Sequence, residues 1–351
     1  MLVAPLDWGL GHATRCIPVI QALLGHGYEV VLAAENAQAS LLQAEFPQLP
    51  CLPLQGYRVR YSRSRRWLPF RMLWQLPGLF RIIKKEHAWL DRVIDEHRID
   101  LVISDNRYGL YSKKRPCIFI THQLTIKAPF TWLEKKLQQV NYRYINRFTA
   151  CWIPDTGGEN NLAGLLAHPA VKPLIPVRYI GLLSRFNRKP APIVYDYCFL
   201  LSGPEPQRSI LEKKVIGGLR DVPGPVLLVR GLPSETGIPA VPSNVTVVNH
   251  LPGKRMEEAI QQSGLVISRS GYTTVMELVS MQKKALLIPT PGQTEQEYLA
   301  ARLHRQAACY SVSQEAFSMQ VHLAAAKAYE QKVAGITVFD PSEIQQLLQQ
   351  L

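Results

Sequence analysis

A glycine-rich turn with a histidine follows the first apolar stretch of the chain, in the run Asp7-Trp8-Gly9-Leu10-Gly11-His12. The two glycines allow the backbone to turn close to a ligand, and free N–H groups at the start of the following helix favour an anion. His12 on such a turn is able to remove a proton at neutral pH, and Asp7 is near enough in the chain to serve instead or to orient it. The alternative is that His12 only caps the helix or bonds to the backbone.

A second run, Ser268–Glu277 (SRSGYTTVME), joins an apolar stretch to a helical one through small residues. Its backbone donors and hydroxyl groups suit a phosphate. Glu277 falls about one turn inside the helix, where a carboxylate can accept two hydroxyl groups of a ribose. Alternatively, Glu277 is an exposed residue that favours the positive end of the helix dipole.

Two further turns also follow apolar stretches. Pro289–Glu297 (PTPGQTEQE) offers Gln and Glu side chains that suit the hydroxyl groups of a sugar, although N-capping by Thr294 explains part of the pattern. Ser202-Gly203-Pro204 is a weaker turn of the same kind.

The elements that must position these residues alternate between short apolar runs and helical stretches, which predicts parallel sheets covered by helices. Leu2–Leu6 and Tyr28–Ala33 enclose a helical stretch at Ala13–His26, which makes a βαβ unit. The other strands expected in the first half are Ile99–Ser104, Cys117–Thr121, Ala150–Pro154 and Arg178–Gly181, and the other helices are Leu73–His97 and Trp132–Phe148.

The pattern restarts after Leu182–Pro192, a basic stretch with two prolines that fits a linker and a hinge. The strands expected there are Tyr197–Leu201, Val226–Val229, Val245–Val248, Leu265–Ile267 and Ala285–Ile288. We therefore expect an α/β protein with two doubly wound domains that face a cleft. The expected domains are residues 1–182, a linker at 183–192, residues 193–335, and a C-terminal helix at 336–351 that is able to pack back on the first domain.

Composition excludes several classes of protein. The 351 residues include 40 Lys+Arg and 27 Asp+Glu, a formal charge of +13, and 47% are hydrophobic, enough for a core in each of two domains. No apolar run approaches the ~18 residues that cross a bilayer, and the N-terminus lacks the pattern of a signal peptide, so we expect neither a membrane-spanning nor a secreted protein. The six cysteines lie far apart, which argues against a zinc site or disulfides and indicates reduced thiols in the cytoplasm.

Much of the positive charge lies in one aromatic segment, residues 57–85, which contains nine basic residues and no acidic one. Within it, Trp67–Phe80 alternates bulky apolar side chains with arginine. This pattern favours contact with an anionic membrane surface through Arg58–Lys85. The alternative is a helix whose apolar side chains fill the core; a nucleic-acid partner is not expected, because no recognised motif accompanies the charge.

The second half of the chain resembles the C-terminal domain of glycosyltransferase family 28, typified by the N-acetylglucosaminyltransferase that makes lipid II. The similarity is strongest across Asn249–Arg302 and includes SRSGYTTVMEL and PTPGQTEQEY. The GLGH turn resembles the first glycine-rich loop of the same two-domain fold, called GT-B. The resemblance implies an inverting, metal-independent transfer of a sugar from a UDP-sugar.

By position, the resemblance also implies roles for single residues. His12 stands where the proposed catalytic base lies, with Asp7 as the other candidate. Glu277 would bind the ribose, Gln296 the donor sugar and the backbone of Leu251 the uracil. The full set on the donor side is Gly9, Gly11, Ser202, Gly203, Leu251, Ser270, Gly271, Thr273, Thr274, Glu277, Gln293, Gln296 and Glu297. The acceptor side would hold Asp105, His122 and Gln123.

Three features depart from the family pattern. The second glutamine of the sugar loop is Glu297, the HEQN acceptor loop is THQL at Thr121–Leu124, and the first loop lacks the usual GGTGGH run. GLGHATRC at Gly9–Cys16 also resembles the GxGHxxRC turn of the UDP-sugar hydrolase of pseudaminic acid synthesis, a GT-B protein in which water replaces the acceptor. The third glycine of a dinucleotide fingerprint would fall at Thr14, which disfavours an NAD enzyme.

The sequence therefore predicts a cytoplasmic glycosyltransferase at the inner face of the plasma membrane. It would move a sugar, with N-acetylglucosamine as one candidate, from a UDP-sugar to a lipid-linked or cell-envelope acceptor. A nucleotide-sugar hydrolase or epimerase of the same fold is the alternative, and a non-enzymatic nucleotide-sugar or lipid-binding protein is a third class.

Overall fold

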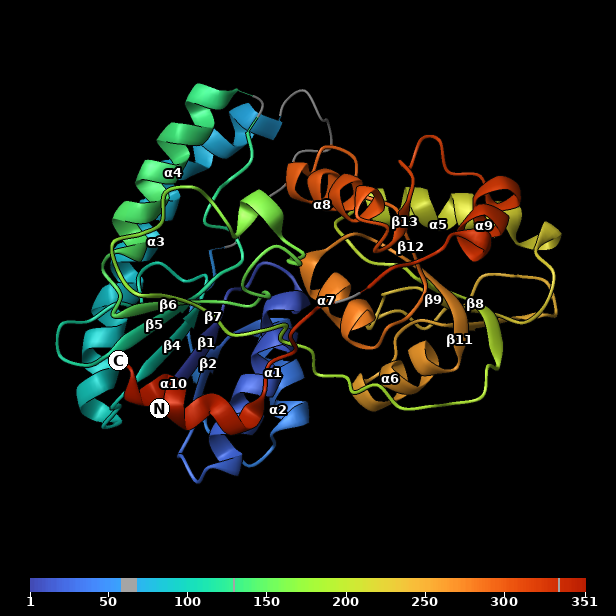
Figure 1. Cartoon of the computed structure of the whole chain (residues 1–351). Helices are drawn as coiled ribbons and strands as arrows, with labels where there is room; N and C mark the ends of the chain where they lie inside the picture. The colour runs from blue at the N-terminus through green and yellow to red at the C-terminus, as the bar shows by residue number, and fades with distance from the viewer. Residues whose placement is uncertain (58–67, 129, 334) are drawn as a thin grey trace. The chain divides into compact units, whose positions relative to one another are not determined.

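The computed structural model describes residues 1–57, 68–128, 130–333 and 335–351, with the backbone only for residues 68–77. These residues form two compact units (Figure 1). Unit 1 contains the chain up to Arg185 together with Ile336–Leu351, and unit 2 contains Phe186–Gly335.

Unit 1 is built on a seven-stranded parallel sheet with the order β3-β2-β1-β4-β5-β6-β7. Its strands are β1 (Leu2–Pro5), β2 (Val31–Ala34), β3 (Cys51–Pro53), β4 (Val102–Asp105), β5 (Cys117–Ile120), β6 (Ala150–Ile153) and β7 (Val177–Tyr179). Its helices are α1 (Leu10–Gly25), α2 (Asn36–Glu45), α3 (Leu68–Glu96), α4 (Thr131–Ile145), the 3₁₀ turns η2 (Gly164–Leu166) and η4 (Pro341–Glu343), and α10 (Ile344–Gln349).

The strand order of unit 1 reverses at β1, which has β2 on one side and β4 on the other. The central strands are buried along their whole length, which is why their sequences (LVAP, VISD, CIFI, ACWI) are almost entirely apolar. The one charged residue in them, Asp105, ends β4 directly opposite Pro5 of β1. Ligands of such sheets bind at the carboxyl ends of the strands where the order reverses, so Asp105 lies at the expected place.

Unit 2 repeats this plan with six parallel strands in the order β10-β9-β8-β11-β12-β13. The strands are β8 (Tyr195–Leu200), β9 (Val226–Val229), β10 (Val245–Val248), β11 (Ser263–Ser268), β12 (Ala285–Leu287) and β13 (Tyr310–Ser311). The helices are α5 (Gln207–Gly218), the 3₁₀ turn η3 (Leu219–Asp221), α6 (Gly253–Gln261), α7 (Tyr272–Ser280), α8 (Thr294–Arg305) and α9 (Met319–Ala328).

The order of unit 2 reverses between β8 and β11, and the loops after these two strands carry Ser202-Gly203 and Arg269-Ser270-Gly271. The core below them joins β8, β9, β11 and β12 to α5 and α9 through buried side chains such as Phe199, Val215 and Leu323. Two copies of one strand-and-helix plan therefore confirm the predicted α/β class with two doubly wound sheets.

The last residues of the chain return to unit 1. Leu182 pairs with Val338 in a short parallel bridge, and the Phe339 amide donates to the Leu182 carbonyl (3.1 Å). Gly181 has a positive φ of 79°, and a Cβ there would lie 2.7 Å from the backbone nitrogen of Phe339. α10 then packs beside α1 (Figure 1), with Ile344 fully buried.

Four elements were not anticipated from the sequence: α2, β3, β13 and α9. β3 and β13 are edge strands of three and two residues, and their side chains are mostly half-buried, so they lack the apolar run of a central strand. α2 buries only Gln38 and Leu42 and has almost no amphipathic pattern.

The segment for which we predicted membrane contact lies partly outside the described residues, since positions 58–67 are not described. In the rest of it, Phe80, Arg81, Lys84 and Lys85 of α3 are exposed. No helix in the described part of the chain has both the length and the hydropathy to cross a bilayer. All six cysteines are free thiols, and five of them are buried.

Candidate functional site

The glycine turn of unit 1 connects β1 to α1. Gly9 is the N-cap of α1 and has a φ of 82°, a left-handed conformation that favours glycine. Gln38 of α2 stabilises the turn: its Nε2 donates to the Asp7 carbonyl (2.9 Å) and the Gly9 carbonyl (3.3 Å). Gly11 lies in the first turn of α1, and His12 follows it.

His12 contacts Asp105 at the point where the sheet order reverses. Its Nδ1 lies 2.9 Å from Asp105 Oδ2, and 15% of the His12 side chain is exposed whereas Asp105 is fully buried. The contact exists because β1 and β4 are neighbours, so the residues that follow β1 come over the end of β4. The sequence placed His12 on the catalytic side and Asp105 on the acceptor side; the structure brings them together.

Arg15, one helical turn after His12, completes this cluster. It is buried, its Nε lies 2.9 Å from both carboxylate oxygens of Asp105, and its Nη2 also bonds Asp105 Oδ1. Its Nη1 lies 3.0 Å from His122 Nδ1, which draws the predicted acceptor-side histidine to the same point. Sequence reasoning missed Arg15, although its i, i+3 spacing from His12 places both side chains on one face of the helix.

Burial and the charge of Arg15 set the protonation states of this cluster. Burial first, and then Arg15, lower the pKa of His12 below its ordinary value of 6.5, against the opposing effect of Asp105. Burial alone would raise the pKa of Asp105, but Arg15 and His12 outweigh it and keep that pKa below its ordinary value. At neutral pH the cluster therefore holds a carboxylate, a guanidinium and a neutral His12.

The tautomer of His12 decides which ring nitrogen is able to accept a proton. Nδ1 is 2.9 Å from both Asp105 Oδ2 and Arg15 Nη2, and a ring nitrogen is either donor or acceptor, so only one of them is its hydrogen-bond partner. If Nδ1 donates to Asp105, Nε2 keeps its lone pair and is able to accept a proton.

The other predicted residues of unit 1 have separate contacts. One carboxylate oxygen of Asp7 accepts from the Tyr57 amide (2.8 Å), and Gly56 packs directly against this carboxylate. The Gln123 carbonyl accepts from Asn141 Nδ2 (3.0 Å), and the Gln123 amide donates to Thr121 Oγ1 (3.0 Å). Asp7 and Gln123 thus brace the loops around the His12 cluster.

Arg107, two residues after Asp105, anchors the end of β4. It is fully buried, its Nε donates to Glu86 Oε1 (2.7 Å), and its Nη1 donates to the Pro5 carbonyl (3.2 Å). Arg107 therefore joins the ends of β1 and β4 to each other and to α3. These contacts fix the position of Asp105 beside His12.

In unit 2, the predicted donor residues gather on the loops at the carboxyl ends of β8, β10, β11 and β12. Ser202 and Gly203 are exposed after β8, and Leu251 is half-buried after β10. Gly271 is the N-cap of α7, Thr273 and Thr274 occupy its first turn, and Glu277 lies further along with 7% exposure. The N-terminus of α7 therefore presents backbone N–H groups at the place where the strand order reverses.

The predicted sugar loop is braced by its own side chains. Gln296 Oε1 accepts from the Thr290 amide (2.9 Å), its Nε2 bonds Gln293 Oε1, and Glu297 Oε1 accepts from the Gly292 amide (2.9 Å). Ser270 Oγ donates to the Gln296 carbonyl (2.8 Å), which ties the turn before α7 to the start of α8. The structure thus brings Ser270, Gln293, Gln296 and Glu297 together.

Arg269, in the loop after β11, bonds the start of α5 and the segments after β12 and β13, and it was not selected from the sequence. Its Nη1 donates to the carbonyls of Ile288 and Pro289 (3.2 Å each), and its Nη2 to the Gln207 carbonyl (2.8 Å) and Gln314 Oε1 (2.6 Å). The sequence gives no signal for Arg269, which stands between Ser268 and Ser270, because only the tertiary structure shows which loops converge on it.

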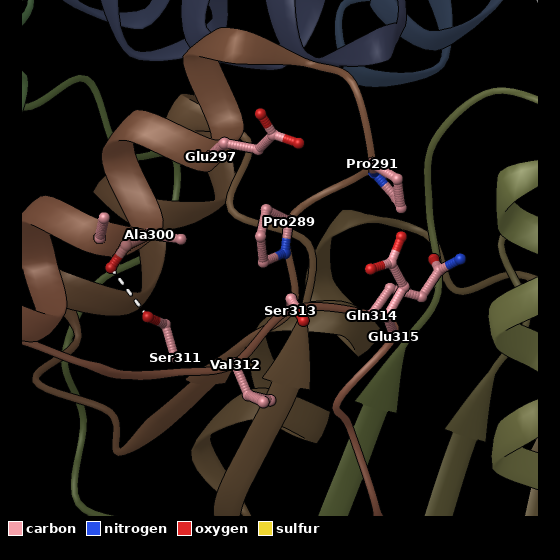
Figure 2. Close-up of a pocket in the computed structure, with 10 residues that line it drawn as sticks. Pro289, Pro291, Glu297, Ala300, Ser311, Val312, Ser313, Gln314 and Glu315 are labelled. Carbon is pink, nitrogen blue, oxygen red and sulfur yellow. Dashed lines mark hydrogen bonds between the residues drawn. The ribbon is translucent and has the colours of Figure 1, made fainter. Parts of the chain in front are cut away.

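A cavity of about 340 Å³ lies next to the sugar loop (Figure 2). Pro289 and Pro291 come from the loop after β12; Glu297, Ala300 and Ala301 come from α8; and the remaining lining residues come from β13 and the segment after it. Figure 2 shows Ser311 beside Ala300, whose carbonyl it bonds (2.9 Å), and Gln314 and Glu315 on the side nearer Pro291. Within the described residues, no three His, Cys, Asp or Glu side chains are grouped as metal ligands.

Comparison with known proteins shows that the chain is similar to glycosyltransferases. Residues 243–334 match the glycosyltransferase family 28 C-terminal domain, which confirms the resemblance seen in the sequence. An uncharacterized glycosyltransferase of Methanosarcina acetivorans is 25% identical over 328 residues, which cover 84% of this chain and 80% of that protein.

Solved structures match over the full length. The spinosyn rhamnosyltransferase SpnG has a TM-score of 0.65 and 16% identity and covers 99% of each chain. MurG of Acinetobacter baumannii has a TM-score of 0.58 and 14% identity and covers 100% of this chain and 99% of its own. These likenesses establish that the two sheets form a GT-B fold.

Proposed function

We propose that this glycosyltransferase of the family 28 and GT-B type is an inverting hexosyltransferase that moves a sugar from a UDP-sugar to an acceptor hydroxyl without a metal. The observation that carries the proposal is the His12–Asp105 pair at the carboxyl ends of β1 and β4. A partly buried imidazole held by a buried carboxylate is the arrangement of a general base.

In this mechanism Nδ1 of His12 donates a charge-assisted hydrogen bond to Asp105, which leaves the lone pair of Nε2 available. Nε2 then takes the proton of the acceptor hydroxyl as the oxygen attacks the anomeric carbon of the sugar. Asp105 stabilises the imidazolium that forms, and Arg15 keeps Asp105 ionised. Asp7, whose carboxylate is bonded to the Tyr57 amide, supports the turn.

The donor is assigned to the loops of unit 2. The N–H groups at the start of α7, with Gly271, Thr273 and Thr274, would stabilise the negative charge that grows on the departing UDP. Glu277 would hold the ribose, Leu251 the uracil, and Gln293, Gln296 and Glu297 the sugar. The match of residues 243–334 to the family 28 C-terminal domain supports this assignment, since it includes all of these residues. The thymidine diphosphate complex known for SpnG makes a dTDP-sugar the natural competitor in a donor test.

The acceptor is proposed to be lipid-linked and reached from the cytoplasmic face of the membrane. Phe130 and Trp132 at the start of α4 are each 60% exposed, and their rings stack with centroids 6.3 Å apart. Phe80 of α3 stacks on Tyr144 of α4 in the same way, with centroids 6.1 Å apart. Lys135 and Lys136 are exposed beside them. Aromatic rings flanked by lysines seat well at an anionic lipid surface.

A donor and acceptor screen tests the function. Purified protein is incubated with radiolabelled UDP-GlcNAc, UDP-Glc, UDP-Gal or a dTDP-hexose, with and without a membrane lipid extract, and UDP release and labelled lipid are measured. Label in lipid that depends on a UDP-sugar supports the proposal, and label from the dTDP-hexose alone overturns the choice of nucleotide. Loss of transfer with a chelator contradicts the metal-independent mechanism.

A nucleotide-sugar hydrolase is the second candidate, because one observation favours it. His12, Arg15 and Cys16, the polar positions of the GxGHxxRC turn, all contact Asp105. In that case water would take the place of the acceptor at Nε2 of His12. Release of free sugar at the same rate with and without lipid would select this function.

A further inference from the structure

Arg269 is a buried cation whose hydrogen-bond partners among the described residues are all uncharged. Its side chain is 1% exposed, its four hydrogen bonds go to three carbonyls and one amide oxygen, and none of the described carboxylates pairs with it. Burial lowers the pKa of Arg269 to about 10, so the guanidinium is still charged at neutral pH. Buried charges in proteins are usually paired, so an uncompensated one calls for an anionic partner.

Two polar atoms at this point also lack hydrogen bonds. Arg269 Nε and Thr290 Oγ1 are buried and have no partner within the described residues, whereas Nη1 and Nη2 of Arg269 are bonded. Thr290 is 2% exposed. A buried donor without a partner costs stability, and such exceptions in a folded protein often mark a ligand contact.

The two atoms lie under the same exposed turn. A Cβ on Gly203 would be 3.5 Å from Thr290 Oγ1 and 4.0 Å from Arg269 Nε. Gly203 has a φ of 103°, and neither Ser202 nor Gly203 makes a hydrogen bond to the described residues. The turn that covers these two atoms therefore has no side chain at Gly203 and no hydrogen bonds from Ser202 or Gly203 to the described part of the chain, so little opposes its displacement.

We propose that Arg269 Nε and Thr290 Oγ1 form an oxyanion subsite that binds a phosphoryl oxygen of the donor when the Ser202–Gly203 turn shifts aside. This inference rests on the proposed function, because it takes the anion to be the diphosphate of a nucleotide-sugar. The subsite is distinct from the backbone N–H groups of α7. It would place a fixed positive charge against the leaving group, where charge develops as the glycosidic bond breaks.

The substitution Thr290→Val separates a ligand contact from a structural role. It keeps the shape of the side chain and removes the unpartnered hydroxyl, so the free protein should melt about 2 °C or more higher. The affinity for UDP, measured by calorimetry, should fall about tenfold, because the hydrogen bond to a charged oxygen is lost. Uridine, which has no phosphate, should bind equally well to both proteins.

Two further variants control the result. Thr290→Ser keeps a hydroxyl and should retain affinity for UDP. Thr156→Val removes a buried hydroxyl that accepts from the Thr337 amide (2.9 Å), so it should lower the melting temperature and leave UDP binding unchanged.

The outcomes distinguish the two proposals. If the wild-type protein binds neither UDP nor dTDP, the proposed function fails and this inference fails with it. If the wild-type protein binds UDP and Thr290→Val binds it as tightly, the subsite is wrong while the proposed function stands. Binding of inorganic pyrophosphate that is weakened by Thr290→Val to the same extent as UDP would show that the subsite reads the phosphate alone, as proposed.

Discussion

At the scale of single residues, the chemistry proposed for unit 1 depends on four side chains that contact one another. His12 alone would be an ordinary imidazole on a helix. Asp105 orients it, Arg15 keeps Asp105 ionised, and Nδ1 of His122 accepts a hydrogen bond from Arg15 Nη1. Because 15% of the His12 side chain is exposed and Asp105 is fully buried, we propose His12 as the group that meets a substrate.

Replacing the imidazole tests this assignment directly. We expect His12→Gln to lower kcat by about 10²- to 10⁴-fold, the usual contribution of a general base, and to leave the Kd for UDP unchanged. His26→Gln is the matched control, since His26 ends the same helix and bonds only backbone through its Nδ1. Turnover of His12→Gln equal to that of the control would exclude His12 as the base.

The pH dependence follows from the lowered pKa of His12. The base works only when neutral, so kcat should be constant above pH 6.5 and fall as the pH drops through the lowered pKa. Asp105 raises the pKa of His12, so Asp105→Asn should move this acidic limb to lower pH besides reducing kcat. A limb that stays in place or moves upward in a kcat–pH profile would contradict the pair.

The same shift affects stability, with a definite sign. Below pH 6.5 the unfolded chain takes up a proton at His12 more readily than the folded one, so the free energy of unfolding falls as the pH is lowered towards the pKa of the folded state. Circular dichroism at each pH therefore accompanies the kinetic profile, and only the range with an unchanged spectrum is used.

At the scale of elements, both candidate sites are made by loops that follow neighbouring parallel strands. Pairing of β1 with β4 brings His12 and Asp105 together, and pairing of β8 with β11 brings Gly203 to Arg269. The loops are short and joined by many hydrogen bonds, so we expect small changes in their backbone to displace the side chains of the site.

Gly56 gives a test of this tight fit. A methyl group at Gly56 would overlap the carboxylate of Asp7, so Gly56→Ala should destabilise the protein by about 1–3 kcal/mol and displace the glycine turn. Gly217→Ala, at a glycine of α5 with open space around it, should instead stabilise by about 0.4–1 kcal/mol. Equal unfolding free energies for the two variants in a urea titration would show that Asp7 is not held as described.

At the scale of the whole molecule, the chain leaves unit 1 at Arg185, builds unit 2, and returns at Ile336. The returning segment is anchored by Ile344, whose side chain is fully buried within unit 1. Unit 1 therefore depends on residues from both ends of the sequence, and unit 2 does not.

This dependence predicts a local effect. Ile344→Ala should reduce the stability of unit 1 by about 2–5 kcal/mol, because a buried side chain leaves a cavity. In hydrogen exchange, the amides of α1 should then exchange faster and those of α7 should not change. Gln346→Ala, at an exposed position of the same helix, is the control. Faster exchange in α7 as well would contradict the independence of the two units.

The sequence by itself determined the α/β class, most of the buried strands and the glycine-rich turns, because these depend on local properties: apolar runs, helix stops and backbone freedom at glycine. It also carried the resemblance to glycosyltransferase family 28, which lies in contiguous motifs. Edge elements such as β3 and β13 were not predictable, since two or three half-buried residues give no pattern.

Only the tertiary structure decided which residues act together. Asp105 is 93 positions from His12, and Arg269 bonds Gln207 and Gln314, which are 62 and 45 positions away in opposite directions. Sheet order sets these contacts, and no local pattern encodes which strand will lie beside which. For that reason the contacts of Arg15 with Asp105 and His122, and those of Arg269 with Gln207 and Gln314, became visible only in the folded chain.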